Sequence, residues 1–189
     1  MVASKRDELV QKAMHIFYRD GFHATGMDTL VKETGISKTS MYKHFRTKED
    51  LILATLRFRD EVFRNHFVRR LEELAADPKE QLYAMFDVLQ EWFDGKEFSG
   101  CVFVKASGEY PEHDAPILNI AAEHKNLLHQ FTTRIARNAG AKDPERLASQ
   151  LMILKEGAAV LAHIKGNSGT AKEAKEAAAL LIESQCEQS

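Results

Sequence analysis

A run of side chains between Lys38 and Phe45 has the composition of a surface that contacts nucleic acid. Met41 and Phe45 lie four residues apart, which places both on one face of a helix and turns the other side chains outward. The outward residues are Thr39, Ser40, Tyr42, Lys43 and His44. Short hydroxyl side chains let a helix approach base edges closely, and lysine and tyrosine reach phosphates or purine acceptors. The alternative is that the aromatic residues belong to a core and that the lysines are merely solvated.

The element that must position this run is the second of two short helices. A helix is expected over about 27–34, where Gly35 ends it, and another over about 38–45, capped by Ser37. Two short helices joined by a glycine-containing turn have the dimensions of a helix-turn-helix, although such pairs also occur in helical proteins that never meet DNA. The next helix begins at Lys48, and its N-terminus offers free N–H groups and a positive dipole end to a phosphate.

The rest of the chain shows the helical period as well. Further helices are predicted over about 4–20, 47–74, 78–93, 116–139, 143–165 and 170–186. Ser4 and Thr47 are the expected N-caps of the first two of these, and Gly21 is expected to end the first. Residues 101–110 fit either a short strand or a short helix, and their helical surroundings favour the helix. The chain is therefore expected to be all-α, with about nine helices.

Composition places the chain among ordinary globular proteins, because 44% of its 189 residues are hydrophobic and 29% are charged. Its first 50 residues hold nine Lys and Arg against seven Asp and Glu, whereas the remainder holds 17 against 21. A slight excess of positive charge in the first 50 residues, followed by an acidic remainder, is typical of a protein that binds a polyanion locally. We find no signal-peptide pattern, no membrane-spanning apolar run and only two cysteines. We therefore expect a cytoplasmic protein without a membrane partner or a disulfide framework.

The stretch from Gly21 to Leu51 resembles the DNA-binding region of the TetR family of bacterial regulators. The turn, a Tyr-x-His-Phe element at 42–45 and a Lys-Glu-x-Leu element at 48–51 occur together in order, so the resemblance is specific over about the first 50–60 residues. It implies an N-terminal helix-turn-helix DNA-binding domain, which we assign to residues 1–47. It also implies a larger helical domain for ligand binding and dimerisation, assigned to residues 48–189.

The resemblance implies DNA contacts for individual positions of this motif. Thr25 and Lys48 would contact phosphates at its two ends, and Tyr42 and His44 match the pair that contacts the DNA backbone. The part of the recognition helix that meets the major groove consists of Lys38, Thr39, Ser40 and Lys43. The sequence departs from the family at Gly26, where Ser or Thr is usual. Glycine can still cap the helix, but a side-chain contact to phosphate is lost there.

The last two predicted helices are rich in small residues, which let helices approach closely. Because the resemblance implies a dimer, we expect these helices to form its interface. The expected interface residues are Leu151, Leu154, Ala158, Leu161, Ala174 and Ala178. The alternative is that this stripe is buried in the core of one chain. A twofold dimer would place its two helix-turn-helix motifs on the half-sites of a palindrome, roughly 34–36 Å apart.

Aromatic residues of the C-terminal domain offer material for an apolar or aromatic ligand pocket. The predicted pocket residues are Phe63, Phe67, Trp92, Phe103 and Phe131. Each of them could instead be an ordinary core residue. No cluster of like charges in the sequence identifies a class of ligand, so the effector is left unnamed.

Cys101 follows Gly100 at an expected helix start, where the helix dipole favours a thiolate. A Gly-Cys pair before an apolar run also resembles a subset of TetR-type regulators, some of which respond to electrophiles. Cys101 is therefore a candidate thiol sensor, and the alternative is a buried, inert cysteine.

Residues of metal-ligating type occur in the second half of the chain, at Glu109, His113, Asp114, His124, His129 and His163. Their spacing matches no compact ligand motif, so neither a metal nor another cofactor is expected. A small helical enzyme that uses Cys101 or Glu109 with a histidine is disfavoured, because the sequence lacks a phosphate loop, a nucleophile elbow and zinc-hydrolase spacing.

These observations together predict a ligand-responsive repressor that binds a palindromic operator as a homodimer and is released by a small-molecule effector. The alternatives are a thiol-sensing repressor, a small helical enzyme and a helical adaptor that binds proteins with a vestigial motif.

Overall fold

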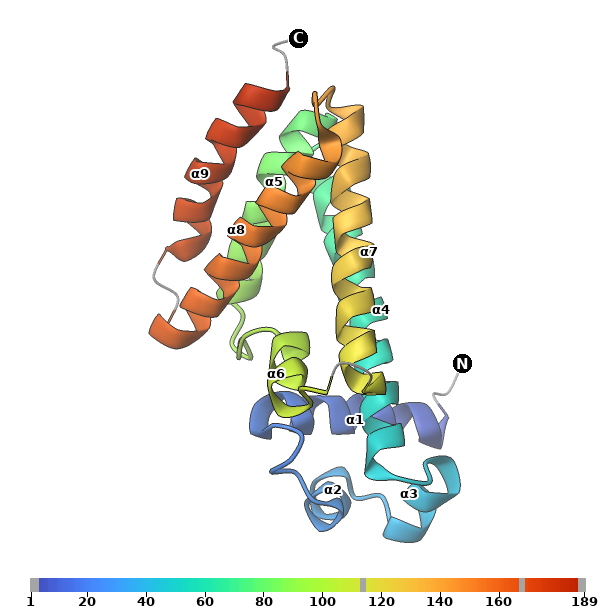
Figure 1. Cartoon of the computed structure of the whole chain (residues 1–189). Coiled ribbons are helices and arrows are strands. Elements are labelled where there is room, and N and C mark those ends of the chain that lie inside the picture. The colour runs from blue at the N-terminus through green and yellow to red at the C-terminus, as the bar shows by residue number, and fades with distance from the viewer. Residues whose placement is uncertain (1–3, 113–114, 167–168, 187–189) are drawn as a thin grey trace. The chain divides into compact units, whose positions relative to one another are not determined.

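The computed structural model describes residues 4–112, 115–166 and 169–186, and these residues form nine α-helices (Figure 1). The helices are α1 (Lys5–Asp20), α2 (Met27–Thr34), α3 (Lys38–His44), α4 (Lys48–Leu74), α5 (Pro78–Phe93), α6 (Val102–Glu109), α7 (Pro116–Asn138), α8 (Pro144–Lys165) and α9 (Thr170–Gln185). Within the described ranges the only β-type pairing is an isolated bridge between Ala141 and Cys186. The all-α prediction is confirmed.

The first helix begins and ends where its sequence signals predict. The hydroxyl oxygen of Ser4 accepts a hydrogen bond from the amide of Asp7 at 3.1 Å, as an N-cap does. Gly21 ends α1 with a φ of +89°, a conformation that favours glycine. One face of the helix, which includes Leu9 and Phe17, is buried.

The short helices α2 and α3 are bounded by local contacts of the kinds that the sequence predicts. Gly35 ends α2 in the left-handed conformation, and the hydroxyl oxygen of Ser37 caps α3 by accepting the amide of Ser40. A reciprocal capping box opens α4, because Thr47 Oγ1 accepts the amide of Asp50 and Asp50 Oδ2 accepts the amide of Thr47, each at 3.0 Å. These caps fix the direction in which α3 leaves the turn.

The segment that fits both a strand and a helix by sequence forms helix α6. Gly100 precedes it with a φ of +78°, and a Cβ atom there would lie only 2.9 Å from Cγ of His163. Glycine is therefore required at this position both by the backbone conformation and by the close packing of α8.

The chain forms two compact units, which are described separately below. The first unit contains Met1–Phe63 and Val102–His124, and the second contains Arg64–Cys101 and Lys125–Ser189. The division passes through α4 and α7, so each of these helices contributes one part to each unit. The predicted boundary between residues 47 and 48 concerns the DNA-binding function, and it stays a prediction.

Each unit has its own apolar core. Buried in the first unit are residues of α1, α2, α3, α4 and the α1–α2 turn, among them Phe17, Phe22, Leu30, Met41 and Leu51. In the second unit, α9 packs against α5 and α8, as Figure 1 also shows. Alanine residues such as Ala158, Ala174 and Ala178 are buried there, and their small side chains let these helices approach closely.

Helix α8 is the one helix in the described part of the chain that is long and apolar enough to cross a membrane by length and composition. The same composition is typical of a helix that packs inside a protein, and 44% of its most apolar window is buried in this structure.

Candidate nucleic-acid interface

Helix α3 presents polar side chains to solvent and anchors itself through two apolar ones. Met41 and Phe45 are buried, whereas 46% of the Tyr42 surface is exposed. Fully or partly exposed beside Tyr42 are Lys38, Thr39, Ser40, Lys43 and His44. The helix therefore has the two faces that its sequence predicts, and the outer one carries hydroxyl, phenol, imidazole and ammonium groups.

Lys38 is the one residue of this outer face with an ion pair in the described structure. Its Nζ atom lies 3.0 Å from Oδ1 of Asp28, the second residue of α2. The hydrogen bond to Asp28 and the charge of that carboxylate raise the pKa of Lys38. An exposed pair of this kind contributes little to stability, so the ammonium group can exchange Asp28 for a phosphate or a base at small cost.

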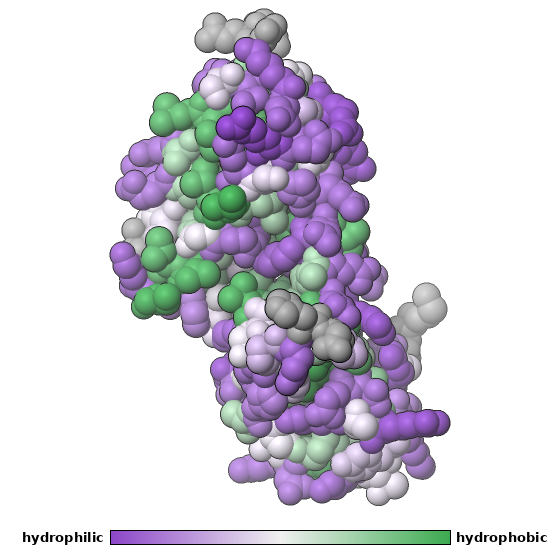
Figure 2. All heavy atoms as spheres, in the orientation of Figure 1, coloured by the Kyte–Doolittle hydropathy of each residue, from purple (hydrophilic) through white to green (hydrophobic). Residues whose placement is uncertain are grey.

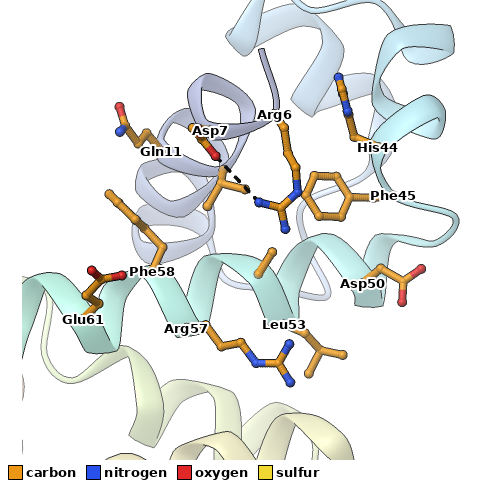
Figure 3. Close-up of a pocket in the computed structure, with 12 residues that line it drawn as sticks. Arg6, Asp7, Gln11, His44, Phe45, Asp50, Leu53, Arg57, Phe58 and Glu61 are labelled. Atoms are coloured by element: carbon orange, nitrogen blue, oxygen red, sulfur yellow. Dashed lines mark ion pairs between the residues drawn. The ribbon is translucent and has the colours of Figure 1, made fainter. Parts of the chain in front are cut away.

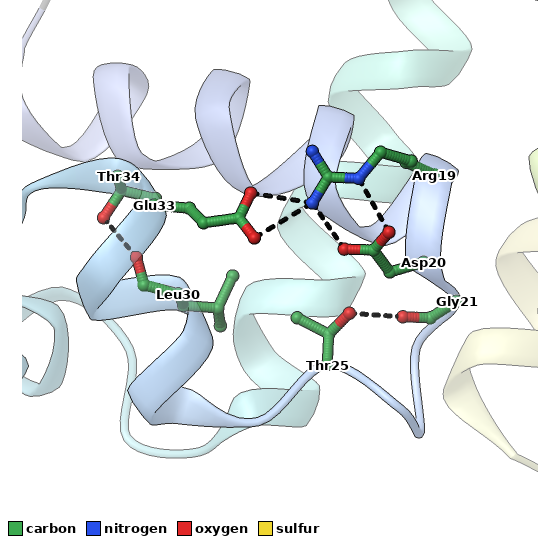
Figure 4. A network of polar contacts seen from close by, with 7 residues as sticks. All are labelled: Arg19, Asp20, Gly21, Thr25, Leu30, Glu33 and Thr34. Carbon is green, nitrogen blue, oxygen red and sulfur yellow. Dashed lines mark hydrogen bonds and ion pairs between the residues drawn. The ribbon is translucent and has the colours of Figure 1, made fainter.

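Thr25 is almost completely buried, which the sequence does not predict. Its hydroxyl donates a hydrogen bond of 2.6 Å to the carbonyl oxygen of Gly21 (Figure 4). The hydroxyl proton is thus directed into the turn, whereas a phosphate contact requires a donor that points outward. Gly26 is the N-cap of α2 and is exposed, and a Cβ atom there would have no neighbour within 4 Å.

Lys48 lies at the first position of α4 and is bound to the α1–α2 turn. Its Nζ atom donates to the carbonyl oxygens of Phe22 at 3.0 Å and Thr25 at 3.3 Å. An ammonium group has three donors, so one remains for a phosphate. The structure therefore fixes Lys48 beside the turn, and its contact with a phosphate stays a prediction.

Glu109, the last residue of α6, also holds this turn, and sequence reasoning considers it only as a metal ligand or a catalytic acid. Its Oε1 and Oε2 atoms accept the amides of Phe22 at 3.0 Å and His23 at 2.6 Å. The His23 ring contacts the Glu109 carbonyl oxygen through Nε2 at 2.8 Å and stacks on Tyr110 with centroids 4.6 Å apart. Burial raises the pKa of Tyr110. A separation of 86 positions between His23 and Glu109 hides this contact from the sequence.

A charged network ties the end of α1 to the end of α2 (Figure 4). The guanidinium of Arg19 binds Oδ1 of Asp20 through Nε and Oε2 of Glu33 through Nη2, each at 2.7 Å. Hydrogen bonds to Asp20 and then to Glu33 raise the pKa of Arg19. This network orients α2, which leads through the turn at Gly35 into α3.

A groove of about 640 Å³ lies in the first unit between α1, the end of α3 and the first half of α4 (Figure 3). The guanidinium of Arg6 lies over the ring of Phe45, 5.1 Å from its centroid. The groove is lined by both acidic and basic side chains, including Asp7, Arg57 and Glu61. This mixture of charges does not identify a ligand class.

The five aromatic residues predicted to line an effector pocket have different neighbours. In the first unit, Phe103 stacks on His124 with centroids 3.8 Å apart, and Phe63 meets the same ring edge-on at 5.5 Å. His124 is buried and its Nδ1 lies 2.7 Å from Oδ1 of Asp60.

In the second unit, the rings of Phe67 and Phe131 are 6.2 Å apart, and Trp92 packs edge-on against Phe98. Effector binding by these five aromatic residues therefore stays a prediction.

Cys101 is partly exposed and directly precedes α6. The Nζ atom of Lys125 lies 3.5 Å from its Sγ atom and 2.7 Å from Oε2 of Glu156. Glu156 also binds Lys155, which is only 4% exposed, at 2.9 Å. Burial alone would raise the pKa of Glu156, but the charges and hydrogen bonds of Lys155 and Lys125 outweigh burial and lower it to about 2.

The candidate metal ligands have other contacts where the structure describes them. His113 and Asp114 lie outside the described residues. His129 contacts Ser149, and His163 packs against Gly100. Among the described residues, no three histidine, cysteine or acidic side chains lie close enough to hold a metal ion together.

Four of the six residues predicted for a dimer interface are buried inside the chain itself. Leu151, Ala158, Ala174 and Ala178 are buried in the second unit, Leu154 is partly exposed, and Leu161 is exposed. A regular stripe of leucine and alanine predicts a buried face, and α8 and α9 use this face in packing with each other and with α5. These four residues are therefore not available for contact with a second copy of the chain.

The outward face of α8 and α9 carries large apolar side chains, of which the sequence analysis predicted only Leu161 for the interface. Ile153, Ile164 and Leu180 are 71%, 70% and 76% exposed, and Val160 and Leu161 are exposed as well. Figure 2 shows apolar surface, in green, on the side of the molecule where α8 and α9 lie in Figure 1. The sequence shows that these apolar residues cluster in α8 and α9. Only the packing of the two helices against α5 shows which of their faces is exposed.

Residues 9–55 match the family described as bacterial regulatory proteins, tetR family. The transcriptional repressor KstR2 of Mycolicibacterium smegmatis is 35% identical over 85 residues, which cover 44% of this chain and 40% of that protein. A solved structure of a TetR-type regulator from Streptomyces avermitilis is 29% identical, with a TM-score of 0.83 over 97% of this chain and 98% of that one. A TetR-family regulator of Streptomyces coelicolor, 24% identical, has the same fold, with a TM-score of 0.89 over 96% of each chain.

Proposed function

Because this chain belongs to the TetR family of bacterial transcriptional regulators, we propose that it is a ligand-responsive repressor that binds a palindromic operator as a homodimer. The proteins that it resembles are regulators of transcription, and the chain is a regulator rather than an enzyme. The proposal places its action in the cytoplasm, where the chromosome of a bacterium lies.

The observation that carries the proposal is the two-faced helix α3. Met41 and Phe45 bind it to the unit, so the opposite face is held rigidly outward. The side chains proposed to reach base edges are those of Lys38, Thr39, Ser40 and Lys43. Tyr42 and His44 on the same face are proposed to contact the DNA backbone and to set the register of the helix in the groove.

The anchoring contacts are proposed to come from the turn and from the N-terminus of α4. Lys48 has one ammonium donor left for a phosphate, and Gly26 exposes the N-terminus of α2. Thr25 is proposed to act through the main chain of the turn, because its hydroxyl is bound to Gly21.

The dimer is proposed to form through the outward faces of α8 and α9. Ile153, Leu161, Ile164 and Leu180 provide exposed apolar surface there, and a twofold axis would bring the patch against its copy. Two α3 helices related by that axis fit a palindrome whose half-sites lie about one turn of the DNA helix apart. Of the sequence-predicted residues, only Leu161 and the partly exposed Leu154 can contribute directly.

Release by an effector is proposed to act through α4. This helix begins at Lys48 in the first unit and ends at Leu74 in the second. A change in its orientation would therefore change how helix α3 of each copy meets the operator. A coupling of ~1–3 kcal/mol suffices to lower operator occupancy measurably.

The experiment is a binding titration with the DNA directly upstream of the protein's own gene, at several salt concentrations. A repressor binds this fragment selectively, and its affinity falls steeply with salt because phosphate contacts displace counterions. Lys43→Ala and Tyr42→Ala should each weaken binding about tenfold or more. Lys96→Ala, which removes an exposed ammonium from the loop between α5 and α6, is the matched control and should change nothing. Equal binding of all variants would count against α3 as the reader.

A second candidate, repression controlled by the thiol of Cys101, is favoured by one specific contact. Cys101 can be reached from solvent, and Lys125 places an ammonium group 3.5 Å from the sulfur. If the thiol is the sensor, a thiol-alkylating electrophile such as N-ethylmaleimide should release the wild-type protein from DNA but leave Cys101→Ser bound. Cys186→Ser is the control, because this second cysteine is buried. Release of Cys101→Ser by the reagent would exclude the thiol mechanism.

A further inference from the structure

The turn between α1 and α2 is held from two sides by helices of the same unit. From α6, the two carboxylate oxygens of Glu109 accept the amides of Phe22 at 3.0 Å and His23 at 2.6 Å. From α4, the ammonium of Lys48 donates to the carbonyl oxygens of Phe22 at 3.0 Å and Thr25 at 3.3 Å. The peptide that joins Phe22 to His23 therefore has a cation at its carbonyl end and an anion at its N–H end.

This arrangement makes the contacts of Glu109 and Lys48 interdependent. Hydrogen bonds to charged groups are stronger than those between neutral groups, and a peptide polarised at one end binds its partner at the other end more tightly. Removal of the carboxylate of Glu109 thus weakens the hold of Lys48 on the Phe22 carbonyl. The two helices are coupled through a single peptide unit, without a direct contact between their side chains being required.

The surrounding contacts show that the turn is built to receive this carboxylate. Gly21 has a φ of +89°, and a Cβ atom there would lie only 3.1 Å from Oε1 of Glu109. Phe22 is fully buried, and its ring contacts Phe17 and Tyr110. A side chain at position 21 or a shift of Phe22 would disturb the approach of the acid.

A further contact joins α6 to the last turn of α1. Lys105 donates to the carbonyl oxygen of Tyr18 at 2.9 Å, and its ammonium lies 5.0 Å from the centroid of the Tyr18 ring. Burial lowers the pKa of Lys105. Helix α6 thus binds the end of α1 through Lys105 and the following turn through Glu109, which fixes the path of the chain into α2.

We propose that Glu109 is a positioning residue for DNA binding. From α6 it fixes the Phe22–Thr25 turn, and through this turn it sets the positions of Lys48 and of the α2 N-terminus at Gly26. These are the groups to which the proposed function assigns phosphate contacts, so the inference rests on that function. Glu109 itself touches no DNA in this scheme.

The first experiment measures the turn in the free protein. In Glu109→Ala, the amides of Phe22 and His23 should exchange with solvent hydrogen at least tenfold faster than in the wild type, because both lose their acceptor. Glu109→Gln keeps one carbonyl oxygen and should lie between the two. The matched control is Glu112→Gln, which removes the same charge from an exposed residue three positions further on. Unchanged exchange in Glu109→Ala would overturn the proposed clamp.

The second experiment measures binding of the same variants to the DNA upstream of the protein's own gene. We expect Glu109→Ala to bind about tenfold more weakly, with a salt dependence reduced by about one phosphate contact. Glu112→Gln should retain both the affinity and the salt dependence of the wild type. A purely structural role of Glu109 would lower the melting temperature but leave the salt dependence intact, and that result would overturn the proposal. So would an equal loss in Glu112→Gln.

A double variant identifies the route of the effect. If Glu109 acts partly through Lys48, the combined loss of affinity in Glu109→Ala with Lys48→Ala should be clearly smaller than the product of the two single losses. Fully multiplicative losses would overturn the link to Lys48. Failure of the wild-type protein to bind DNA would instead refute the proposed function, and with it this role. In that case the amide exchange data would still decide whether Glu109 holds the turn.

Discussion

The two units of this chain are ordered by different kinds of contact. In the second unit, α5, α8 and α9 pack through aliphatic and small side chains such as those of Leu151 and Ala178, which are fully buried. In the first unit, the ends of the short helices and the turn between α1 and α2 are fixed by directional polar contacts. Arg19, Lys48 and Glu109 provide these contacts.

The difference follows from what each kind of contact can do. Apolar burial is non-directional and contributes most of the stability of a fold, whereas a hydrogen bond contributes little net stability but fixes geometry. A surface that must match DNA in register therefore benefits from directional contacts around its turn. The comparison predicts that substitutions in the second unit mainly reduce stability, and that substitutions of the polar contacts in the first unit mainly reduce DNA binding.

The largest loss of stability is expected from Leu151→Ala. This side chain is fully buried in the second unit, so truncation removes apolar contacts and leaves a cavity. The free energy of unfolding should fall by about 2–5 kcal/mol, measured by urea denaturation. Val104→Ala, at an exposed position of α6, is the control and should change it by less than about 0.5 kcal/mol. A small effect of Leu151→Ala would refute the apolar core as the main support of this unit.

Glu156→Gln tests the partly buried cluster of charges that Glu156 forms with Lys155 and Lys125 in the second unit. The pKa of Glu156 is lowered from 4.5 to about 2, because the attraction of Lys155 and Lys125 outweighs burial. A lowered carboxylate pKa stabilises the folded state fully above pH 4.5, and this contribution is lost as the pH falls toward 2. The variant should be less stable by roughly 2–3 kcal/mol at neutral pH.

The pH dependence provides the decisive measurement for this cluster. The difference in unfolding free energy between the wild type and Glu156→Gln should shrink steadily between about pH 4.5 and pH 2. A difference that stays constant over this range would show that the charge of Glu156 is not what stabilises the unit.

Ile164→Asp tests the outward face of the second unit. Ile164 is 70% exposed, so the substitution should leave the fold of one chain intact. In a twofold dimer the new carboxylates would be desolvated against apolar surface, and we expect dissociation to become at least tenfold easier by analytical ultracentrifugation. Val104→Asp introduces the same charge on α6 and should leave the oligomeric state unchanged. Dissociation in both variants, or in neither, would contradict the proposed interface.

The smallest effect on stability is expected from Arg19→Ala in the first unit. The network of Arg19 with Asp20 and Glu33 is exposed to solvent, and ion pairs of this kind contribute little to stability. If the network orients α2, the affinity for DNA should nevertheless fall several-fold in a binding titration. A loss of stability without a loss of affinity for DNA would contradict the proposed difference between the two units.

Much of the local structure could be predicted from the sequence, because its signals act over three or four residues. Ser4, Ser37 and Thr47 cap helices where expected, and Gly21 and Gly35 end them. The four-residue spacing of Met41 and Phe45 also determines which face of α3 points outward. The resemblance of the 21–51 stretch to the TetR family follows from the same compact segment.

The contacts that only the tertiary structure decides join residues far apart in the sequence. Glu109 meets His23 across 86 positions, and no periodicity within either segment reports that contact. The burial of Thr25 and the binding of Lys48 to the turn have the same origin, since both depend on how α4 and the turn pack.

The two faces of α8 are the clearest case of this division. The sequence by itself determines that the helix has an apolar stripe through Leu151 and Ala158, because spacings of three and four residues align on one side. Whether that stripe meets its own chain or a second copy depends on where α5 and α9 lie. In the structure it meets its own chain, and Ile153 and Ile164 are left outside. The spacing of apolar side chains identifies an apolar face of a helix, but only tertiary packing decides whether that face is buried within the chain or left exposed.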